Sequence, residues 1–415
     1  MKYLFNIQLF ADPNTQTTAK NSQGNDLSST MKTFYKTSLL ENARSEHFFN
    51  QFGMKQPLPK NEGKKVEWRK FDSFGKAMTP LTEGVTPDGR NINMVKIEKE
   101  ISQYGDYATI SDRLELEAVD PIIVAATEEF GAQAGDTLDT VTRNEVITGT
   151  NVIYAGGESY RYNLEATDTL DATLVDQAVT FLKKMKTPTI NGDYVAIIHP
   201  SVAYDLREDS SWLDVHKYAQ PEEIFNGEIG KLHGVRFVES TEQKIFKGKF
   251  TDSVDVFTLK TALDGTGSTT IAIKEALTAD EATALADTHI WIGGNRVEIS
   301  AATAGAAGSA TLTASETVKS VAANSAIYPA DEAGKNNAAV YATTFFGKDA
   351  WGIIDPSAEA LEVIVKQRGS AGTSDPLDQR STVGWKASTA AKILYQERLV
   401  RVESGSFYSA TDEAN

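Results

Sequence analysis

Five histidines are the residues of this chain best suited to acid–base catalysis or metal binding. They lack the i, i+4 spacing of a zinc-binding helix and any His-Glu-x-x-His motif. One of them ends an apolar segment just before Pro200, where a hydrogen-bonded structural histidine is more common than a catalytic base. The sequence therefore predicts no metal site from its histidines, which are His47, His199, His216, His233 and His289.

Other catalytic chemistry has equally little support. The chain has no cysteine, which excludes disulfides and thiol nucleophiles and is typical of a protein made in a reducing cytoplasm. It has no Gly-x-Ser-x-Gly elbow, and its Gly-rich segment GTGSTT (265–270) lacks the lysine of a phosphate loop. With 57 acidic residues, neighbouring carboxylates such as Glu128 and Glu129 are expected by chance. We therefore expect no catalytic residue, no cofactor and a structural role, so not an enzyme.

The charge of the chain limits its partners. A net charge of −16 and a pI near 4.9 argue against a surface that binds nucleic acid tightly, which needs clustered Lys and Arg. An acidic surface can still enclose DNA, because a container wall should repel phosphate. No segment approaches the ~18 uninterrupted apolar residues of a membrane helix, so we predict no membrane span. Asn6 and Gln8 interrupt the apolar start of the chain, which argues against a signal peptide.

Two segments have patterns that favour contact with another chain. Near the N-terminus, Phe5, Ile7 and Leu9 alternate with polar residues, which is the period of a strand that can add to a neighbouring sheet edge; a tip without fixed structure is the alternative. Residues 64–101 predict a long hairpin with an irregular tip and little core of its own. This pattern favours a projection that reaches a partner over an ordinary surface hairpin. Its candidate intersubunit contact residues are Trp68, Arg69, Phe71 and Phe74.

Beyond the hairpin the patterns mix helix and strand. Residues 119–148 predict a long helix, with Asp120 placed to cap it and Pro121 at its first helical position. A further helix and buried strands are expected between 169 and 250. These patterns predict an α+β fold.

The composition changes between 251 and 337. Fourteen of the sixteen residues from 301 to 316 are Ala, Thr, Gly or Ser, which separates this segment from the rest of the chain. Short strand patterns surround it, and Gly293 with Gly294 predicts the turn of a hairpin. We therefore expect an inserted small β-rich domain, because a long insertion is tolerated where both its ends lie together on a surface.

Several segments together resemble the major capsid proteins of tailed bacteriophages, of the type known from a coliphage podovirus. They follow one another in the order of that family and account for most of the chain outside the N-terminal arm and the insert. The segments are MKTFYKTSLLENAR (31–44), FGMKQPLPKNEGKKVEWRKF (52–71), LTEGVTPDG (81–89), QYGDYATISD (103–112), EEFGAQAGDTLDTVTRNEVITGTNVIYAGG (128–157), NGEIGKLHGVRFVES (226–240), VKQRGSAGTSDPLDQRSTVGWKA (365–387) and LVRVESGS (399–406).

The resemblance implies the Hong Kong 97-like capsid fold and a division of the chain along its known parts. These parts are an N-terminal arm and lead-in (1–60), an extended hairpin loop (61–105), a peripheral domain with a long spine helix (106–168), an axial domain in two parts (169–250 and 338–390), the inserted domain (251–337), and a C-terminal strand that returns to the long sheet of the peripheral domain, with a tail (391–415).

The function that the resemblance implies is self-assembly, as hexamers and pentamers, into the icosahedral head of a tailed phage. The shell would enclose double-stranded DNA without sequence-specific binding. Portal and scaffolding proteins, and in some phages decoration proteins, are the implied partners. The implied location is the virion capsid, assembled in the cytoplasm of the bacterial host. Two alternatives remain open: an encapsulin-like protein nanocompartment, and a carbohydrate-active or adhesive surface protein built around the insert.

Overall fold

The structure is a computed structural model that describes residues 48–57, 64–71, 74, 76–78, 80–81, 83–84, 86, 89–117, 122–209, 231–250, 254–330, 332–354, 361–370 and 377–415. The chain forms two compact units. Unit 1 consists of Met1–Thr142 and Trp351–Lys392, and unit 2 of Arg143–Ala350 and Ile393–Asn415. Both units combine helices with strands, which confirms the predicted α+β class.

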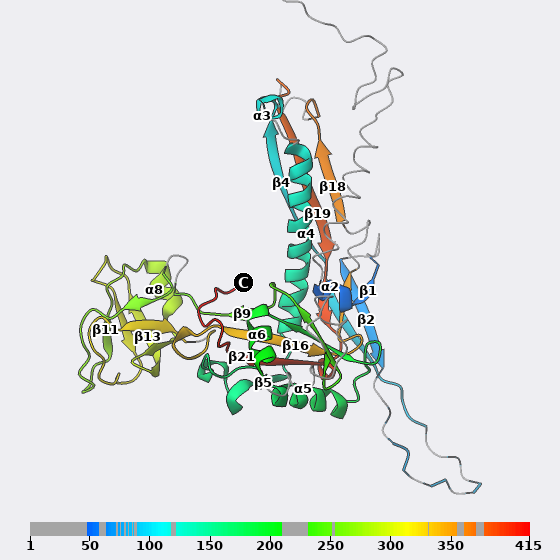
Figure 1. Cartoon of the computed structure of the whole chain (residues 1–415), viewed down its shortest axis with the longest axis horizontal. Helices are drawn as coiled ribbons and strands as arrows, with labels where there is room; N and C mark the ends of the chain where they lie inside the picture. Colours follow the sequence, from blue (N-terminus) through cyan, green and yellow to red (C-terminus); the bar gives the residue numbers. More distant parts are fainter. Residues whose placement is uncertain are drawn as a thin grey trace, which may run out of the picture. The chain divides into compact units, whose positions relative to one another are not determined.

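Unit 1 combines a hairpin, two three-stranded sheets and a long helix (Figure 1). The predicted hairpin at 64–101 and the predicted long helix are both present, as β2–β3 and α4. The two residues expected to begin the helix lie outside the described residues. The elements are α2 (Phe48–Phe52), β1 (Met54–Gln56), β2 (Lys65–Phe71), β3 (Met94–Glu100), β4 (Ser102–Ser111), α3 (Asp112–Glu117), α4 (Ile122–Ile147, its last residues in unit 2), β17 (Trp351–Ile354), β18 (Leu361–Lys366), β19 (Arg380–Thr389) and β20 (Ala391–Ile393).

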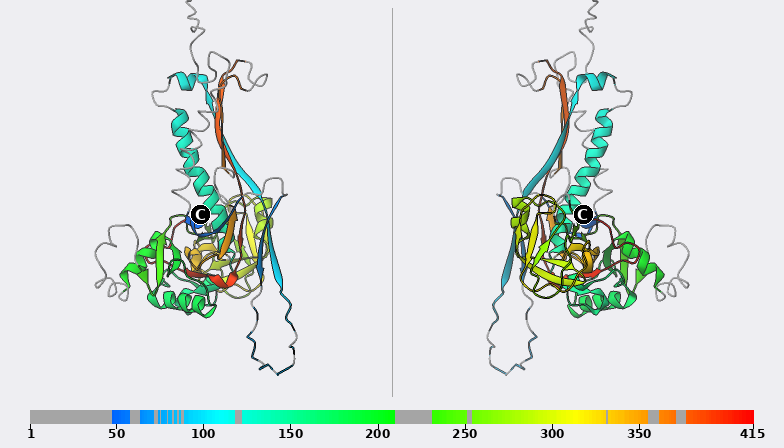
Figure 2. Two further views of the ribbon diagram at one scale, coloured as in Figure 1. Left: turned by 90° about the vertical axis from the view of Figure 1, so that its right-hand side faces the viewer. Right: turned by 90° about the vertical axis from the view of Figure 1, so that its left-hand side faces the viewer.

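One three-stranded sheet of unit 1 has the order β1-β17-β20. The other has the order β18-β19-β4, with both pairings antiparallel. Helix α4 runs along one face of this sheet (Figure 2) and buries Ala134 and Leu138 against it. A polar link crosses the same contact: Trp385 Nε1 donates to Gln133 Oε1 (2.9 Å), and Gln133 Nε2 donates to Asp106 Oδ2 (2.9 Å). One helical glutamine therefore ties two neighbouring strands to the helix.

Unit 2 is built on a mixed sheet in the order β5-β21-β16-β6-β8-β7, with β9 on β16. Helices α5 and α6 pack on this sheet, and the side chain of Asp171 caps α5 by accepting from Leu174 N (2.8 Å). The elements are β5 (Val152–Tyr154), η1 (Ala155–Gly157), η2 (Arg161–Asn163), α5 (Ala172–Lys184), β6 (Tyr194–Ile198), α6 (Pro200–Glu208), β7 (Lys231–Leu232), β8 (Val235–Glu239), β9 (Ile245–Phe246), η4 (Lys335–Asn337), β16 (Val340–Phe346), η6 (Gln396–Arg398) and β21 (Leu399–Ser404).

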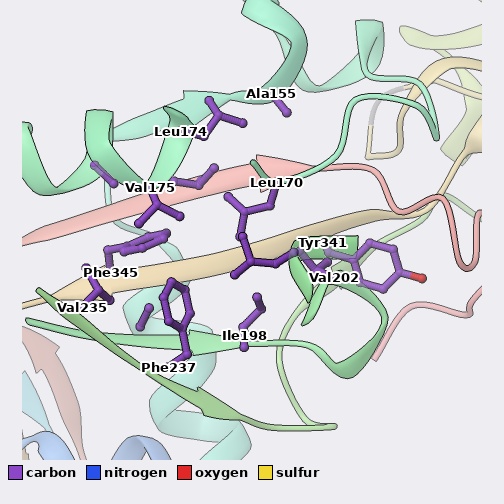
Figure 3. Close-up of a cluster of buried hydrophobic side chains, with 14 of the residues drawn as sticks. Ala155, Leu170, Leu174, Val175, Ile198, Val202, Val235, Phe237, Tyr341 and Phe345 are labelled. Atoms are coloured by element: carbon purple, nitrogen blue, oxygen red, sulfur yellow. The ribbon is translucent and has the colours of Figure 1, made fainter. Parts of the chain in front are cut away.

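The core of unit 2 lies between the sheet and its helices (Figure 3). Phe237 and Phe345 from two strands meet edge to face, with ring centroids 6.1 Å apart. Leu174 and Val175 of α5 point into the same cluster. Strand β16 is buried along its whole length, as expected for a central strand, and β6 and β8 correspond to the strands predicted at 194–199 and 235–240.

The segment after β9 forms a second, separate core within unit 2. Its strands have the order β10-β15-β12-β13-β14-β11. Two backbone hydrogen bonds join the outer strands β10 and β11 and close the sheet into a barrel: Lys260 N donates to Ala272 O (2.8 Å), and Lys274 N donates to Thr258 O (3.0 Å). The predicted Gly293-Gly294 turn joins β12 to β13, and both glycines have positive φ. The elements are β10 (Phe257–Thr258), β11 (Thr270–Ala272), α8 (Ala279–Leu285), β12 (Thr288–Ile292), β13 (Asn295–Thr303), β14 (Thr311–Ala314) and β15 (Ala326–Pro329).

A single side chain holds the two ends of the barrel segment together. The amide of buried Asn337 accepts from Gly248 N (3.0 Å) and donates to Gly248 O (3.1 Å). Gly248 must lack a side chain here, because an added Cβ would lie 2.8 Å from the ring of Pro329. The entry and the exit of the segment are therefore adjacent, the geometry that makes an insertion tolerable.

Two predicted strand placements are wrong. Strands β18 and β19, expected in the axial domain, instead pair with β4 and pack against α4 in unit 1. The closing strand β21, expected to return to the long sheet of the peripheral domain, instead lies between β16 and β5 in unit 2. In both cases the buried face of the strand was readable from the sequence, but its partner was not, because the pairing joins segments far apart in the chain.

Candidate assembly surface

The β2–β3 hairpin has two faces of different character. In its antiparallel register, Trp68 lies opposite Ile97 and Arg69 lies opposite Lys96. Because side chains alternate along a strand, Trp68 and Ile97 share one face with Val66, and the charged pair shares the other. Val66 and Trp68 are buried, whereas Arg69 is exposed. One face of the hairpin therefore packs within the subunit, and the other face is exposed to solvent.

The exposed face carries a ladder of alternating charges. Glu67 accepts from Arg69 Nε (2.5 Å) and from Lys96 Nζ (2.8 Å), and Glu98 pairs with Lys96 and with Lys65 (3.3 Å). Hydrogen bonds from Lys96 and Arg69 lower the pKa of Glu67, and hydrogen bonds from Lys96 and Lys65 lower the pKa of Glu98. The same partners raise the pKa of Lys96. Exposed pairs of this kind contribute little to stability.

The prediction that Trp68 contacts another subunit is wrong, because its side chain is buried within its own subunit. Its side chain is 4% exposed and packs on Gly352 of β17 within the same unit. An added Cβ at Gly352 would lie 2.6 Å from Trp68 Cε2, so the glycine is required for this contact. Trp68 therefore holds the hairpin onto its own subunit and is not available to a neighbour.

The end of the hairpin away from Trp68 exposes apolar side chains. Phe71 lies opposite Met94 at the end of the register, and Phe71 and Phe74 are 65% and 59% exposed. Sequence reasoning missed four further exposed apolar residues, although large apolar residues in an otherwise polar tip were a usable signal. These four are Met78, Leu81, Ile92 and Met94. The intersubunit role of Arg69, Phe71 and Phe74 stays a prediction.

The predicted contact residues of the N-terminal tip, Phe5, Ile7 and Leu9, lie outside the described residues. The first described helix after the tip, α2, is held by α4. Asp139 of α4 accepts from Phe49 N (2.7 Å) and Asn50 N (3.1 Å) at the start of α2. Thr142 Oγ1 adds a hydrogen bond to the side chain of Asn50 (2.6 Å). The first described helix, α2, is therefore fixed to α4.

A polar cluster around His199 contains the residue types of a hydrolase but not their geometry. Ser201 Oγ donates to Asp412 Oδ2 (3.2 Å), and His199 Nδ1 accepts from Ser201 N instead of from its hydroxyl. Burial lowers the pKa of His199 and raises the pKa of Tyr341, whose hydroxyl also donates to Asp412 (2.6 Å). In a catalytic triad the hydroxyl of the serine is hydrogen-bonded to the histidine, whereas here the hydroxyl of Ser201 is bonded to Asp412. The cluster fastens residues 405–415 onto α6 and β16, and the side chain of His199 caps α6 by accepting from Ser201 N.

A buried ion network fixes the end of α4 in unit 2. Glu403 is fully buried and accepts from Arg161 Nε (2.6 Å) and Nη2 (2.8 Å) and from Arg401 Nε (2.7 Å). The same Arg401 donates to the carbonyl oxygens of Ile147 and Gly149 at the C-terminal end of α4. A cation at this end of a helix is favourable because it faces the negative end of the helix dipole.

Within the described ranges, no three His, Asp or Glu side chains gather in a group able to hold a metal ion. None of the described helices is long and apolar enough to span a membrane.

Residues 124–278 match the family of phage capsid proteins. The fold is similar to those of solved phage capsids. The capsid of cyanophage P-SCSP1u has 12% sequence identity and a TM-score of 0.52, with 87% of this chain and 88% of that chain covered. The capsid of cyanophage Pam1 has 14% sequence identity and a TM-score of 0.52, with 86% of this chain and 89% of that chain covered. The capsid of Ralstonia phage GP4 has 11% sequence identity and a TM-score of 0.51, with 88% of this chain and 89% of that chain covered. No curated protein matches the chain.

The family match covers most of α4 and of the unit 2 sheet, and the similarity in fold extends over both units. The chain therefore has the fold of solved phage capsid proteins, and residues 124–278 match the phage capsid protein family. The nanocompartment and surface-protein alternatives are not favoured.

Proposed function

We propose that this chain is a phage major capsid protein, which forms hexamers and pentamers that close into an icosahedral shell of the Hong Kong 97-like fold. The observation that carries the proposal is the apolar end of the β2–β3 hairpin. Six large apolar side chains are exposed there on a segment with little core of its own. Such a patch on a soluble chain marks an interaction site, and a shell subunit uses heterologous contacts that close into rings.

In this proposal the hairpin is the extended loop that lies on a neighbouring subunit, and α4 is the spine of the peripheral domain. The charge ladder supports this role, because its ion pairs Lys96–Glu67 and Lys65–Glu98 link the two strands on their exposed face. Phe71, Phe74 and the exposed Arg69 are the contact residues. The apolar residues supply the burial, and the arginine fits the polar rim of such an interface.

The proposal extends to the contents and partners of the shell. The net charge of −16 suits a wall that encloses double-stranded DNA without binding it. We propose that the closed barrel between Gly248 and Asn337 faces outward, which its pinned ends and separate core support. Portal and scaffolding proteins, and decoration proteins where present, are the proposed partners, and assembly takes place in the cytoplasm of the bacterial host.

The double substitution Phe71→Ser and Phe74→Ser tests this role. Burying one such side chain contributes about 1.5–3 kcal/mol, so losing two weakens each subunit contact by roughly a hundredfold or more. We expect folded subunits that no longer form particles, as measured by electron microscopy and light scattering. The matched control is Asn91→Ser with Asn93→Ser, which changes polar residues of the same hairpin. Normal particles from the phenylalanine variant would remove the hairpin from the proposed interface.

A further inference from the structure

Strand β4 has one free edge. It pairs with β19 along all ten of its residues, and among the described residues no strand pairs with its other side. Seven of the ten side chains are exposed, and only Ile110 is buried. A long exposed edge offers a row of backbone donors and acceptors to another extended chain.

The hydrogen bonds of Tyr107 show which residues direct their backbone outward. Its N–H donates to Asp106 Oδ1 (2.8 Å) and so is not used in the pairing with β19. In an antiparallel ladder, residues of this kind alternate with those bonded to the partner strand. Gln103, Gly105 and Thr109 therefore also present their N–H and C=O groups at the free edge. One of these outward donors, Tyr107 N–H in the middle of the edge, is bonded to the side chain of Asp106 in the single subunit.

The face of the sheet opposite α4 is hollowed next to this edge. Tyr104 and Ile110 pack toward α4, so the alternate residues of β4 face away from it. On that side lies a cavity of about 630 Å³, lined by Tyr107 and Thr109 among others. Its floor contains Gly105 and Gly384, and a Cβ at these positions would lie 2.4 Å from Trp385 O and 2.6 Å from Tyr107 Cβ. The atoms that these Cβ atoms would meet belong to the paired strands β4 and β19, so the close packing of the two strands requires both glycines.

The N-terminal tip has the sequence and the reach to fill this place. Phe5, Ile7 and Leu9 alternate with Asn6 and Gln8, so a strand formed by the tip has one apolar face. Residues 11–47 span up to about 120 Å when extended, enough to cross to another subunit from the fixed point where α2 begins.

We infer that residues 4–10 of one subunit add as a fourth strand to the free edge of β4 in a neighbouring subunit. Backbone hydrogen bonds to β4 hold the strand, and Phe5, Ile7 and Leu9 cover the hollow beside Tyr107. Asn6 and Gln8 face the other side. The inference rests on the proposed assembly and adds a second contact to it, independent of the hairpin.

Engineered thiols test the pairing directly, because the chain has no cysteine of its own. Subunits with Phe5→Cys, Ile7→Cys or Leu9→Cys are each mixed with subunits carrying Thr109→Cys before assembly, and the particles are oxidised. At least one mixture should give a reducible disulfide dimer, identified by mass spectrometry of the joined peptides, because paired strands bring Cα atoms within disulfide range. Two matched controls, Asn6→Cys with Thr109→Cys and Ile7→Cys with Ser300→Cys, should give severalfold less.

Two results would overturn this inference while leaving the proposed function intact. One is normal particles in which the thiol introduced by Thr109→Cys reacts with maleimide as fast as in free subunits and forms no disulfide with the tip. The other is a disulfide that forms within single, unassembled chains that carry both thiols, which would place the tip on its own subunit. If the unmodified chain forms no particles at all, the proposed function fails and this inference fails with it.

Discussion

Trp68→Ala should lower the free energy of unfolding of the subunit by about 3–5 kcal/mol, the usual cost of removing a large aromatic side chain from a core. The indole is 4% exposed and covers Gly352, so its loss leaves a cavity between the hairpin and β17. Phe71→Ala, three residues further along the hairpin, should change the same quantity by less than about 0.5 kcal/mol, because its side chain is already exposed.

Equilibrium denaturation in urea, followed by circular dichroism, measures both variants. Because Trp68 and Phe71 lie on the same strand, comparing the two variants distinguishes an effect on folding from an effect on assembly. We expect Trp68→Ala to reduce particle yield only through loss of folded subunits, and Phe71→Ala to reduce it from fully folded ones. A Trp68→Ala subunit with wild-type stability that fails to assemble would show that the tryptophan is an intersubunit anchor after all.

Glu403→Ala should be comparably destabilising, by about 3–5 kcal/mol, because breaking a buried ion network leaves its remaining charges unpaired. Arg161 and Arg401 would lose their common partner, and Arg401 would no longer be held at the end of α4. The matched control is Glu362→Ala. Its carboxylate pairs with Lys386 at 2.8 Å but is 58% exposed, so its loss should cost less than about 1 kcal/mol.

Chemical denaturation of the two glutamate variants in parallel measures the difference. Glu403→Gln should lie between Glu403→Ala and the unmodified chain, because the amide keeps one acceptor but not the charge. Equal stabilities for Glu403→Ala and Glu362→Ala would mean that the network does not stabilise unit 2, and that β21 is held by its strand pairing alone.

Local patterns were sufficient to predict the elements but not their partners. The β2–β3 hairpin follows from Val66 and Trp68 on one strand and Val95 and Ile97 on the other, and the β12–β13 turn follows from two glycines. The position of α4 follows from its apolar stripe. Each of these signals lies within a few residues of the element that it predicts.

The errors arose where distant segments meet. Alternation along β2 shows that Trp68 and Arg69 face opposite ways, but not that β17 covers the tryptophan face, because Gly352 is far away in the chain. In the same way, the apolar pattern of β19 fits any sheet that has a place for it. Only the pairing with β4 and the contact with α4 decide which sheet that is.

The central claim is that this chain builds a closed shell through contacts between its own copies. Cryo-electron microscopy of the purified full-length chain, expressed alone and together with candidate portal and scaffolding proteins, tests it most directly. The account predicts closed icosahedral particles in which each β2–β3 hairpin lies on a neighbouring subunit. A chain that stays monomeric at high concentration in every combination, or particles whose hairpins contact only their own subunit, would contradict it.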